Sequence, residues 1–332
     1  MLRVRVRDDA IQIGRHFSLS FQRTLRIPDD GGVYPLPPGL GRFPVCRVRD
    51  YASRVPAAWR EHGGVFIPMY QREALWLSFG GAHWRPTAVK VAVGKVNAIS
   101  GEPWSETLRE DAQDYVVCPD QPWLDGINAG AGFIRQFVAM PLGMGYTVEG
   151  QVTGKEEFGG VQVVAYDPKP GRFPDREPQL RRRLVFDEMI CLCESPPAPF
   201  TDEMGLAAGG RMEQGIYPDE HGVDTWDPTN SGRVYVHIVN SAAFRDITGM
   251  EPPPSPISAR TYTEHGFPWF DLYDEGKGDL APSATLAGVK SVKEKDASLG
   301  FAPQQDDGAL DLPAQQVVTL GTDGGVVVDG TW

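Results

Sequence analysis

The sequence predicts a mainly β protein, with antiparallel sheets in a β-sandwich or barrel-like arrangement, a few short helices and long loops rich in proline and glycine. Short runs of Val, Ile, Phe and Tyr alternate with polar residues along most of the chain, a pattern typical of half-buried strands. Glycine (38) and proline (29) separate these runs and make up about a fifth of the 332 residues. This punctuation favours a turn-rich β fold over a helical bundle.

The central stretch, residues 123–166, shows the pattern most densely. Its runs at 133–139, 146–152 and 161–166 alternate in polarity or are rich in β-branched and aromatic residues, and glycine-containing turns separate them. We therefore expect a three-stranded antiparallel meander here.

Three glycines in this stretch, Gly126, Gly130 and Gly132, raise the alternative of a phosphate-binding loop. A dinucleotide fingerprint requires GxGxxG between a strand and a helix, whereas the residues that follow Gly132 look like a strand. A plain glycine-rich turn is the favoured interpretation.

Short helices are indicated by local signals at their ends. Pro56 precedes a helix predicted to end at Gly63, Asn240 and Ser241 precede a second that Gly249 closes, and Ser258 precedes a third. Residues 71–79 fit either a short helix or a strand. Residues 233–239 predict a strand, and residues 317–328 predict a β-hairpin.

The N-terminal strand, residues 2–7, places Arg3, Arg5 and Arg7 on one face. A solvated face is the simpler interpretation of this basic stripe, and a protein interface is the alternative.

Charge is divided unevenly along the chain, whose net charge is −12. Residues 1–200 hold 24 Lys or Arg and 23 Asp or Glu, whereas residues 201–332 hold 8 and 21. The proline-rich residues 196–199 lie at this change. We therefore predict a β-rich domain at 1–195 and an acidic α+β or β-rich region at 200–332, either separate or packed on the first as one unit.

The same composition limits the partners. Nucleic acid is not expected as a partner, because phosphate binding needs a basic surface. No apolar run approaches the length of a membrane span, and the first residues lack a secretory apolar region. We expect a cytoplasmic protein without membrane insertion, with non-classical release left open.

A candidate metal site lies in an acidic loop that contains His221, Asp224 and Asp227. Carboxylates with an imidazole are ligands for a divalent cation, although a solvated loop explains the same spacing in a chain with 44 acidic residues. No cofactor is expected otherwise.

Two further candidate surfaces follow from composition. Trp269, Phe270 and Tyr273 form an aromatic cluster next to acidic residues, which predicts an aromatic surface for carbohydrate or another ligand. Arg181, Arg182 and Arg183 form a basic run that we predict to be an interface between subunits.

Long phrases of the sequence, covering most of residues 15–295, carry a family resemblance. Among them are GGVFIPMYQREALWLSF, PDQPWLDGINAGAGFIRQFVAMPLGMGYTVEGQVTG, MGLAAGGRMEQGIY and VHIVNSAAFRDITG. In these phrases the chain resembles an uncharacterised family of bacterial and fungal proteins often labelled "integral membrane protein", a label that the hydropathy contradicts. Some fungal members look fused to ubiquitin-like segments. The resemblance implies no established reaction and no catalytic residues.

The leading hypothesis is a non-enzymatic, β-rich protein that self-associates into a homo-oligomer or binds other proteins. It depends on the absence of sequence motifs for hydrolases, zinc proteases and nucleotide binding, and on the division of charge. The alternative is a carbohydrate- or metal-binding enzyme that uses the acidic and aromatic C-terminal surface. The sequence leaves the question of enzymatic activity open.

Overall fold

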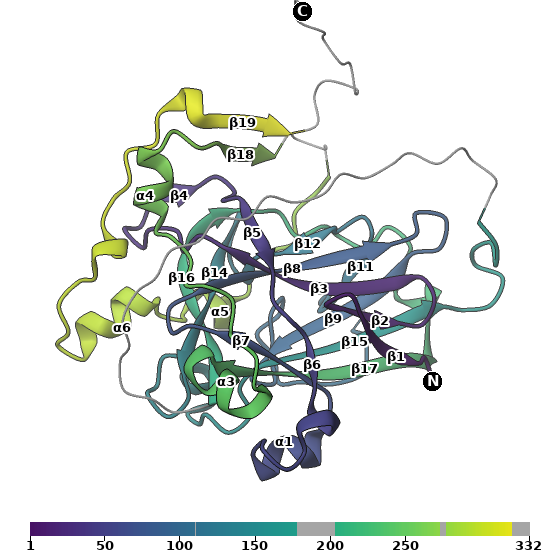
Figure 1. The fold of residues 1–332 in the computed structure, drawn as a ribbon. Coiled ribbons are helices and arrows are strands. Elements are labelled where there is room, and N and C mark those ends of the chain that lie inside the picture. Colours follow the sequence, from purple (N-terminus) through teal and green to yellow (C-terminus); the bar gives the residue numbers. More distant parts are fainter. Residues whose placement is uncertain (110, 178–202, 273–276, 321–332) are drawn as a thin grey trace, which may run out of the picture.

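The computed structural model describes residues 1–109, 111–177, 203–272 and 277–320 (Figure 1). It confirms the mainly β fold class, because a large and mostly antiparallel sheet contains seventeen strands. The strands are β1 (Val4–Arg7), β2 (Ala10–Ile13), β3 (Phe17–Thr24), β4 (Val33–Tyr34), β5 (Gly39–Arg42), β6 (Cys46–Arg47), β7 (Val65–Met69), β8 (Ala74–Gly81), β9 (Thr87–Val93), β10 (Val96–Asn97), β11 (Val116–Cys118), β12 (Trp123–Leu124), β13 (Gly126–Gly130), β14 (Phe133–Pro141), β15 (Val161–Pro168), β16 (Glu203–Glu213), β17 (Trp226–Asn240), and the separate pair β18 (Trp269–Leu272) and β19 (Val317–Leu320).

The helices are short and lie around the outside of the sheet (Figure 1). The α-helices are α1 (Ala57–His62), α2 (Val148–Thr153), α3 (Ser241–Thr248), α4 (Ala259–Glu264), α5 (Ala284–Ala287) and α6 (Val292–Ser298), and the 3-10 helices are η1 (Val48–Tyr51), η2 (Val223–Thr225), η3 (Gln305–Asp307) and η4 (Ala314–Gln316). No helix among the described residues is long and apolar enough to cross a membrane.

The large sheet closes on itself into a barrel-like ring. Strands β1, β2, β3, β8, β14, β16 and β17 pair in that order, each antiparallel to the next. The ring returns to its start because the backbone N–H of Leu2, next to β1, donates to the carbonyl of Ser231 in β17 at 2.8 Å. Closure of this kind satisfies backbone groups that an open edge would expose, except near residues 233 and 234 of β17, which no described strand covers on that side.

A second group of strands extends from β17. Residues Val161–Tyr166 of β15 lie opposite β17 on one side and β9 on the other, and β9 continues to β10 and β11. One large apolar cluster joins both groups, since it includes Ile11 and Leu19 from the ring together with Val91 and Val163. Burial of this core is the main favourable contribution to folding.

The central meander is only partly confirmed. Residues 133–139 and 161–166 are strands, but residues 146–152, predicted as the middle strand, contain helix α2. The Thr147 side chain accepts a hydrogen bond from Gly150 N, and Gly154 ends the helix in a left-handed conformation. The prediction was wrong because these cap residues outweigh the alternation of side chains.

Several local predictions are confirmed. Helix α1 follows Pro56 and ends before Gly63, and α3 has Asn240 as its N-cap, with a side chain that accepts a hydrogen bond from Ala242 N. Residues 71–79, which fitted either type of element, belong mainly to strand β8. The second half of the predicted hairpin at 317–328 lies outside the described residues.

Strands from both sides of residues 196–199 share the large sheet. β16 and β17 come after this proline-rich stretch, and they pair with β14 and β15, which precede it. The acidic region is therefore joined to the first by hydrogen-bonded strands. Whether the two are also separate folding units stays a prediction.

Candidate functional site

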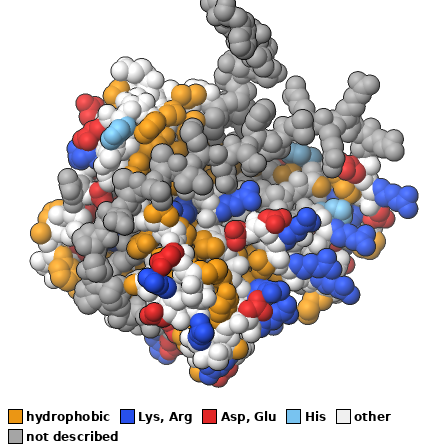
Figure 2. All heavy atoms as spheres, in the orientation of Figure 1, with side chains coloured by type: hydrophobic (Ala, Val, Ile, Leu, Met, Phe, Trp, Pro, Cys, Tyr) orange, Lys and Arg blue, Asp and Glu red, His pale blue; other side chains and the backbone are white. Residues whose placement is uncertain are grey.

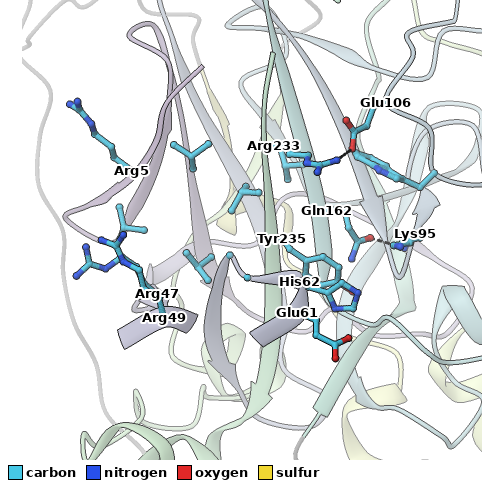
Figure 3. A pocket seen from close by; sticks show the side chains of 18 residues that line it. Arg5, Arg47, Arg49, Glu61, His62, Lys95, Glu106, Gln162, Arg233 and Tyr235 are labelled. Carbon is cyan, nitrogen blue, oxygen red and sulfur yellow. Dashed lines mark hydrogen bonds and ion pairs between the residues drawn. The ribbon is translucent and has the colours of Figure 1, made fainter. Parts of the chain in front are cut away.

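An open groove with a volume of about 990 Å³ lies on the described surface. Its walls come from β1, β6, η1, α1, β7, β15 and β17, and from the turns near Lys95 and Glu106. Arg5, Arg47 and Arg49 lie on one side of it, and Lys95, Glu106 and Arg233 lie on the other (Figure 3). The groove therefore joins segments that are far apart in the sequence.

The floor of the groove follows one edge of strand β17. On this edge Ser231 bonds to Leu2, and Val236 lies opposite Val65 of β7. Between these two points, no described strand pairs with residues 232–235 on the groove side. Leu2 packs against Gly232, and Gly64 packs against the carbonyl of Tyr235, so the uncovered part of this edge is limited to Arg233 and Val234.

Four stacked rings form the end of the groove near α1. His62 stacks on Tyr235 with centroids 4.8 Å apart, Tyr235 stacks on His237 at 4.3 Å, and His237 stacks on Trp59 at 4.5 Å. His62 is exposed, whereas His237 and Trp59 are buried. These contacts, which we call the column of rings, lead from the exposed His62 to the buried Trp59 and fix the outer rings. Figure 3 shows its two outer members, His62 and Tyr235.

The inner members of this column are uncharged at neutral pH. Burial, with a smaller contribution from the nearby His62, lowers the pKa of His237 to about 3, against a hydrogen bond between Nε2 and the carbonyl of Gly63. Burial also raises the pKa of Tyr235, whose hydroxyl donates to the carbonyl of Phe158 at 2.7 Å. The charge of the groove therefore comes from its Arg, Lys and Glu side chains.

Five cationic and two anionic side chains line the groove, which gives it an excess of positive charge. Arg233 pairs with Glu106, and Arg47 pairs with Asp50 at 2.6 Å. Within the described part of the chain, Arg5 and Lys95 form no ion pair. The Lys95 ammonium lies over the Phe158 ring, 3.8 Å from its centroid. These groups can bind carboxylates or other anions.

The predicted metal residues do not form a cluster in the described structure. Asp224 lies 3.8 Å from Lys169 Nζ, and Asp227 accepts hydrogen bonds from Thr229. The His221 ring packs edge-on against Phe173 and Trp226. Among the residues that the structure describes, no three His, Cys, Asp or Glu side chains could hold a metal ion. Cation binding at this loop stays a prediction.

The predicted aromatic surface is divided between core and surface. Trp269 is 0% exposed, and its indole N–H donates to Thr263 Oγ1 at 3.0 Å, so it belongs to the core and not to a surface. Phe270 is half-buried. Tyr273 and the predicted interface residues Arg181, Arg182 and Arg183 lie outside the described residues.

Most groove residues carry no local sequence signal. Arg5 belongs to the basic stripe of the first strand, for which an interface was the alternative interpretation. Lys95 and Arg233 were not predicted as site residues, because nothing in their neighbourhood in the sequence indicates that they meet.

Comparisons with models of known protein families, with curated proteins and with solved structures found no match. The resemblance to the uncharacterised family therefore stays a hypothesis, and the proposals below depend on geometry and charge.

Proposed function

We propose that this protein self-associates head to tail, with the basic groove of one copy binding the acidic C-terminal part of the next. The observation that carries the proposal is the separation of charge in space. The groove holds Arg5, Lys95 and three further cations, one of which, Arg233, belongs to β17. Residues 201–332 as a whole hold 21 acidic and 8 basic residues, and the exposed acids named below lie away from the groove. Opposite potentials on two surfaces favour association between copies.

The acidic partner surface, which we call the acidic end, is formed by Glu264 of α4 together with Asp306 and Asp311. All three are exposed, and none forms an ion pair with a described residue. The α4 helix lies next to the segment that carries the two aspartates, because Arg260 donates to the carbonyl of Ala309 at 3.3 Å. Three carboxylates that no described cation pairs with are thus available to a cationic partner.

The two surfaces lie at different ends of the molecule. The groove lies near β1 and α1, and the acidic end lies near α4 and the C-terminal strands (Figure 1). Lys and Arg side chains gather over the region of β1 in the same orientation (Figure 2). Contact between two different surfaces is heterologous, and it produces rings or filaments according to whether the rotation closes.

Light scattering after gel filtration tests the proposal. At low salt we expect a mass well above the 36.4 kDa of one chain, and the mass should fall as salt screens the exposed charges. The double variant Arg5→Glu with Lys95→Glu, which we call the groove variant, should also have a lower mass in solution. Arg7→Glu is the matched control, since Arg7 is exposed in the same strand and does not line the groove.

A reciprocal variant makes the test specific. By itself, the double variant Glu264→Lys with Asp306→Lys should associate more weakly than the unmodified protein. When it is mixed with the groove variant Arg5→Glu with Lys95→Glu, association between the two variants should be restored. A monomer at every salt and protein concentration would exclude the proposal, and so would an assembly that the groove variant leaves unchanged.

A further inference from the structure

A second and smaller pocket lies apart from the groove. Its volume is about 170 Å³, and its walls include Trp76 of β8, Trp123 of β12, Phe270 of β18 and the Pro37-Pro38 segment. Trp123 lies opposite Ser78 and Leu124 lies opposite Leu77. Continuation of this register places Asp125, which also lines the pocket, opposite Trp76.

The walls are held by backbone contacts. Phe270 and Leu36 exchange two hydrogen bonds, at 2.8 and 3.0 Å, and Thr24 Oγ1 donates to the carbonyl of Pro38 at 2.9 Å. The aromatic rings therefore come from elements of fixed position. A preformed pocket loses little entropy when a ligand binds.

Asp125 differs from the other deeply buried carboxylates. Several of these pair with a cation, in the pairs Glu73–Arg23, Asp114–Lys90, Asp296–Arg72 and Asp307–Arg26. Glu149 instead accepts hydrogen bonds from three backbone N–H groups. Asp125 is 4% exposed and accepts a 2.8 Å hydrogen bond from the neutral amide of Gln214, and no described cation pairs with it.

The environment of Asp125 leaves its negative charge uncompensated. Burial raises the pKa of this carboxyl to about 7, against hydrogen bonds from the Trp123 and Gln214 side chains. A positive ligand next to the carboxylate would remove this cost, because it would replace the lost hydration with a charge partner.

We propose that the pocket formed by Trp76, Trp123, Phe270 and Asp125 binds a methylated ammonium group. Aromatic faces attract cations through their quadrupoles, and quaternary ammonium groups, which carry apolar methyl groups, suit such cages. The carboxylate supplies the opposite charge. This site is independent of the head-to-tail contact, because none of the four residues lines the groove.

Other ligand classes fit the pocket less well. A divalent metal ion needs several oxygen ligands, and Asp125 is the only carboxylate that lines the pocket among the described residues. A sugar needs several polar partners, whereas most of this lining is aromatic or proline. An anion would meet the carboxylate directly.

Calorimetry and tryptophan fluorescence with choline test the proposal, with dimethylbutanol as the uncharged carbon isostere. We expect choline to bind at low millimolar concentration, to quench tryptophan fluorescence and to bind about tenfold more tightly than the isostere. Asp125→Asn should remove this preference, since asparagine keeps the shape and the acceptor for Gln214 but carries no charge.

Trp76→Leu provides a second variant on the outer wall if the asparagine variant fails to fold. It should weaken choline binding about tenfold, whereas Trp104→Leu, in the groove, should have no effect. Equal binding of choline and dimethylbutanol would overturn the proposal. Binding of methyl glucoside in place of choline, or no binding of either compound, would also overturn the proposal of an ammonium site. Neither result depends on whether the protein self-associates.

Discussion

The imidazole of His237 lies against the phenol ring of Tyr235, with the ring centroids 4.3 Å apart and the planes 20° from parallel. His237 also stacks on Trp59 on its other face. A histidine enclosed between two aromatic rings has little access to water, so its charged form is disfavoured. The column of rings that shapes one end of the groove therefore has a direct effect on stability as a function of pH.

We expect the free energy of unfolding to fall as the pH decreases between 6.5 and about 3, because the unfolded His237 takes up a proton at its ordinary pKa of 6.5 and the folded one does so only near 3. The contribution of the uncharged His237 to the free energy of unfolding is fully present above pH 6.5. Below that pH, this free energy changes by at most about 1.4 kcal/mol per pH unit. His237→Gln, which keeps a donor for the Gly63 carbonyl, should flatten this slope in urea unfolding at pH 7 and pH 5. His83→Gln changes an exposed histidine and serves as the control; equal slopes in both variants would contradict the assignment.

Asp125 should have the opposite effect. Its pKa is 3.8 in the unfolded chain and about 7 in the folded one, so the folded state keeps a proton that the unfolded state has lost. The contribution to stability is present below pH 3.8 and is lost as the pH rises to about 7. Asp125→Asn never ionises, and we expect its stability relative to the unmodified protein to be greater at pH 8 than at pH 5. Asp246→Asn, on an exposed helix position, should show no such difference.

Short-range signals explain which elements could be predicted. Pro56, Asn240 and Ser258 specify helix starts through their own side chains or rings, and the structure has helices at these places. The error at 146–152 arose because the alternation of side chains was followed in place of the local caps Thr147 and Gly154. A contact with a more distant residue also holds the N-cap. Glu156, nine residues after Thr147, accepts hydrogen bonds from both its N–H and its hydroxyl, and the alternation of side chains contains no sign of this contact.

The two candidate sites depend on contacts that span the chain. Arg5, Lys95 and Arg233 line one groove because β15 pairs with both β17 and β9, and because the N–H of Leu2, next to β1, bonds to Ser231 of β17. Phe270 reaches Trp76 through a bridge to Leu36. Such pairings leave no local signal in a single sequence, so of Arg5, Lys95, Arg233, Trp76 and Phe270 only Arg5 and Phe270 were singled out from their local surroundings.

Gly126 and Gly132 should respond very differently to substitution by alanine. A Cβ at Gly126 would lie 1.9 Å from the carbonyl oxygen of Arg135, whereas one at Gly132 would meet nothing within 4 Å. We expect Gly126→Ala to destabilise the protein by about 3 kcal/mol, because the paired β13 and β14 backbones must separate. Gly132→Ala should cost about 1 kcal/mol through its positive φ. Urea unfolding measures the free energy of unfolding of both alanine variants. Similar losses in the two would show that β13 and β14 are less closely packed than the 1.9 Å distance implies.

Arg23 and Glu73 form a buried ion pair, in which Glu73 Oε1 accepts hydrogen bonds from Arg23 Nε at 2.9 Å and Nη2 at 2.8 Å. Burial raises the pKa of Glu73, and the charge of Arg23 opposes this rise. Arg23→Met leaves a buried carboxylate without its partner, and we expect a loss of about 3–5 kcal/mol in urea unfolding.

The double variant, with Glu73→Gln added, should recover part of this loss, because glutamine keeps an acceptor for the Tyr70 N–H and removes the unpaired charge. The exposed pair of Arg7 and Asp8 gives the comparison, since Arg7→Met should cost less than about 1 kcal/mol. Arg23 also donates to the carbonyl of Pro254, so its loss should increase hydrogen exchange near that proline-rich segment. Equal costs for Arg23→Met and Arg7→Met would mean that the buried pair contributes no more than a surface pair.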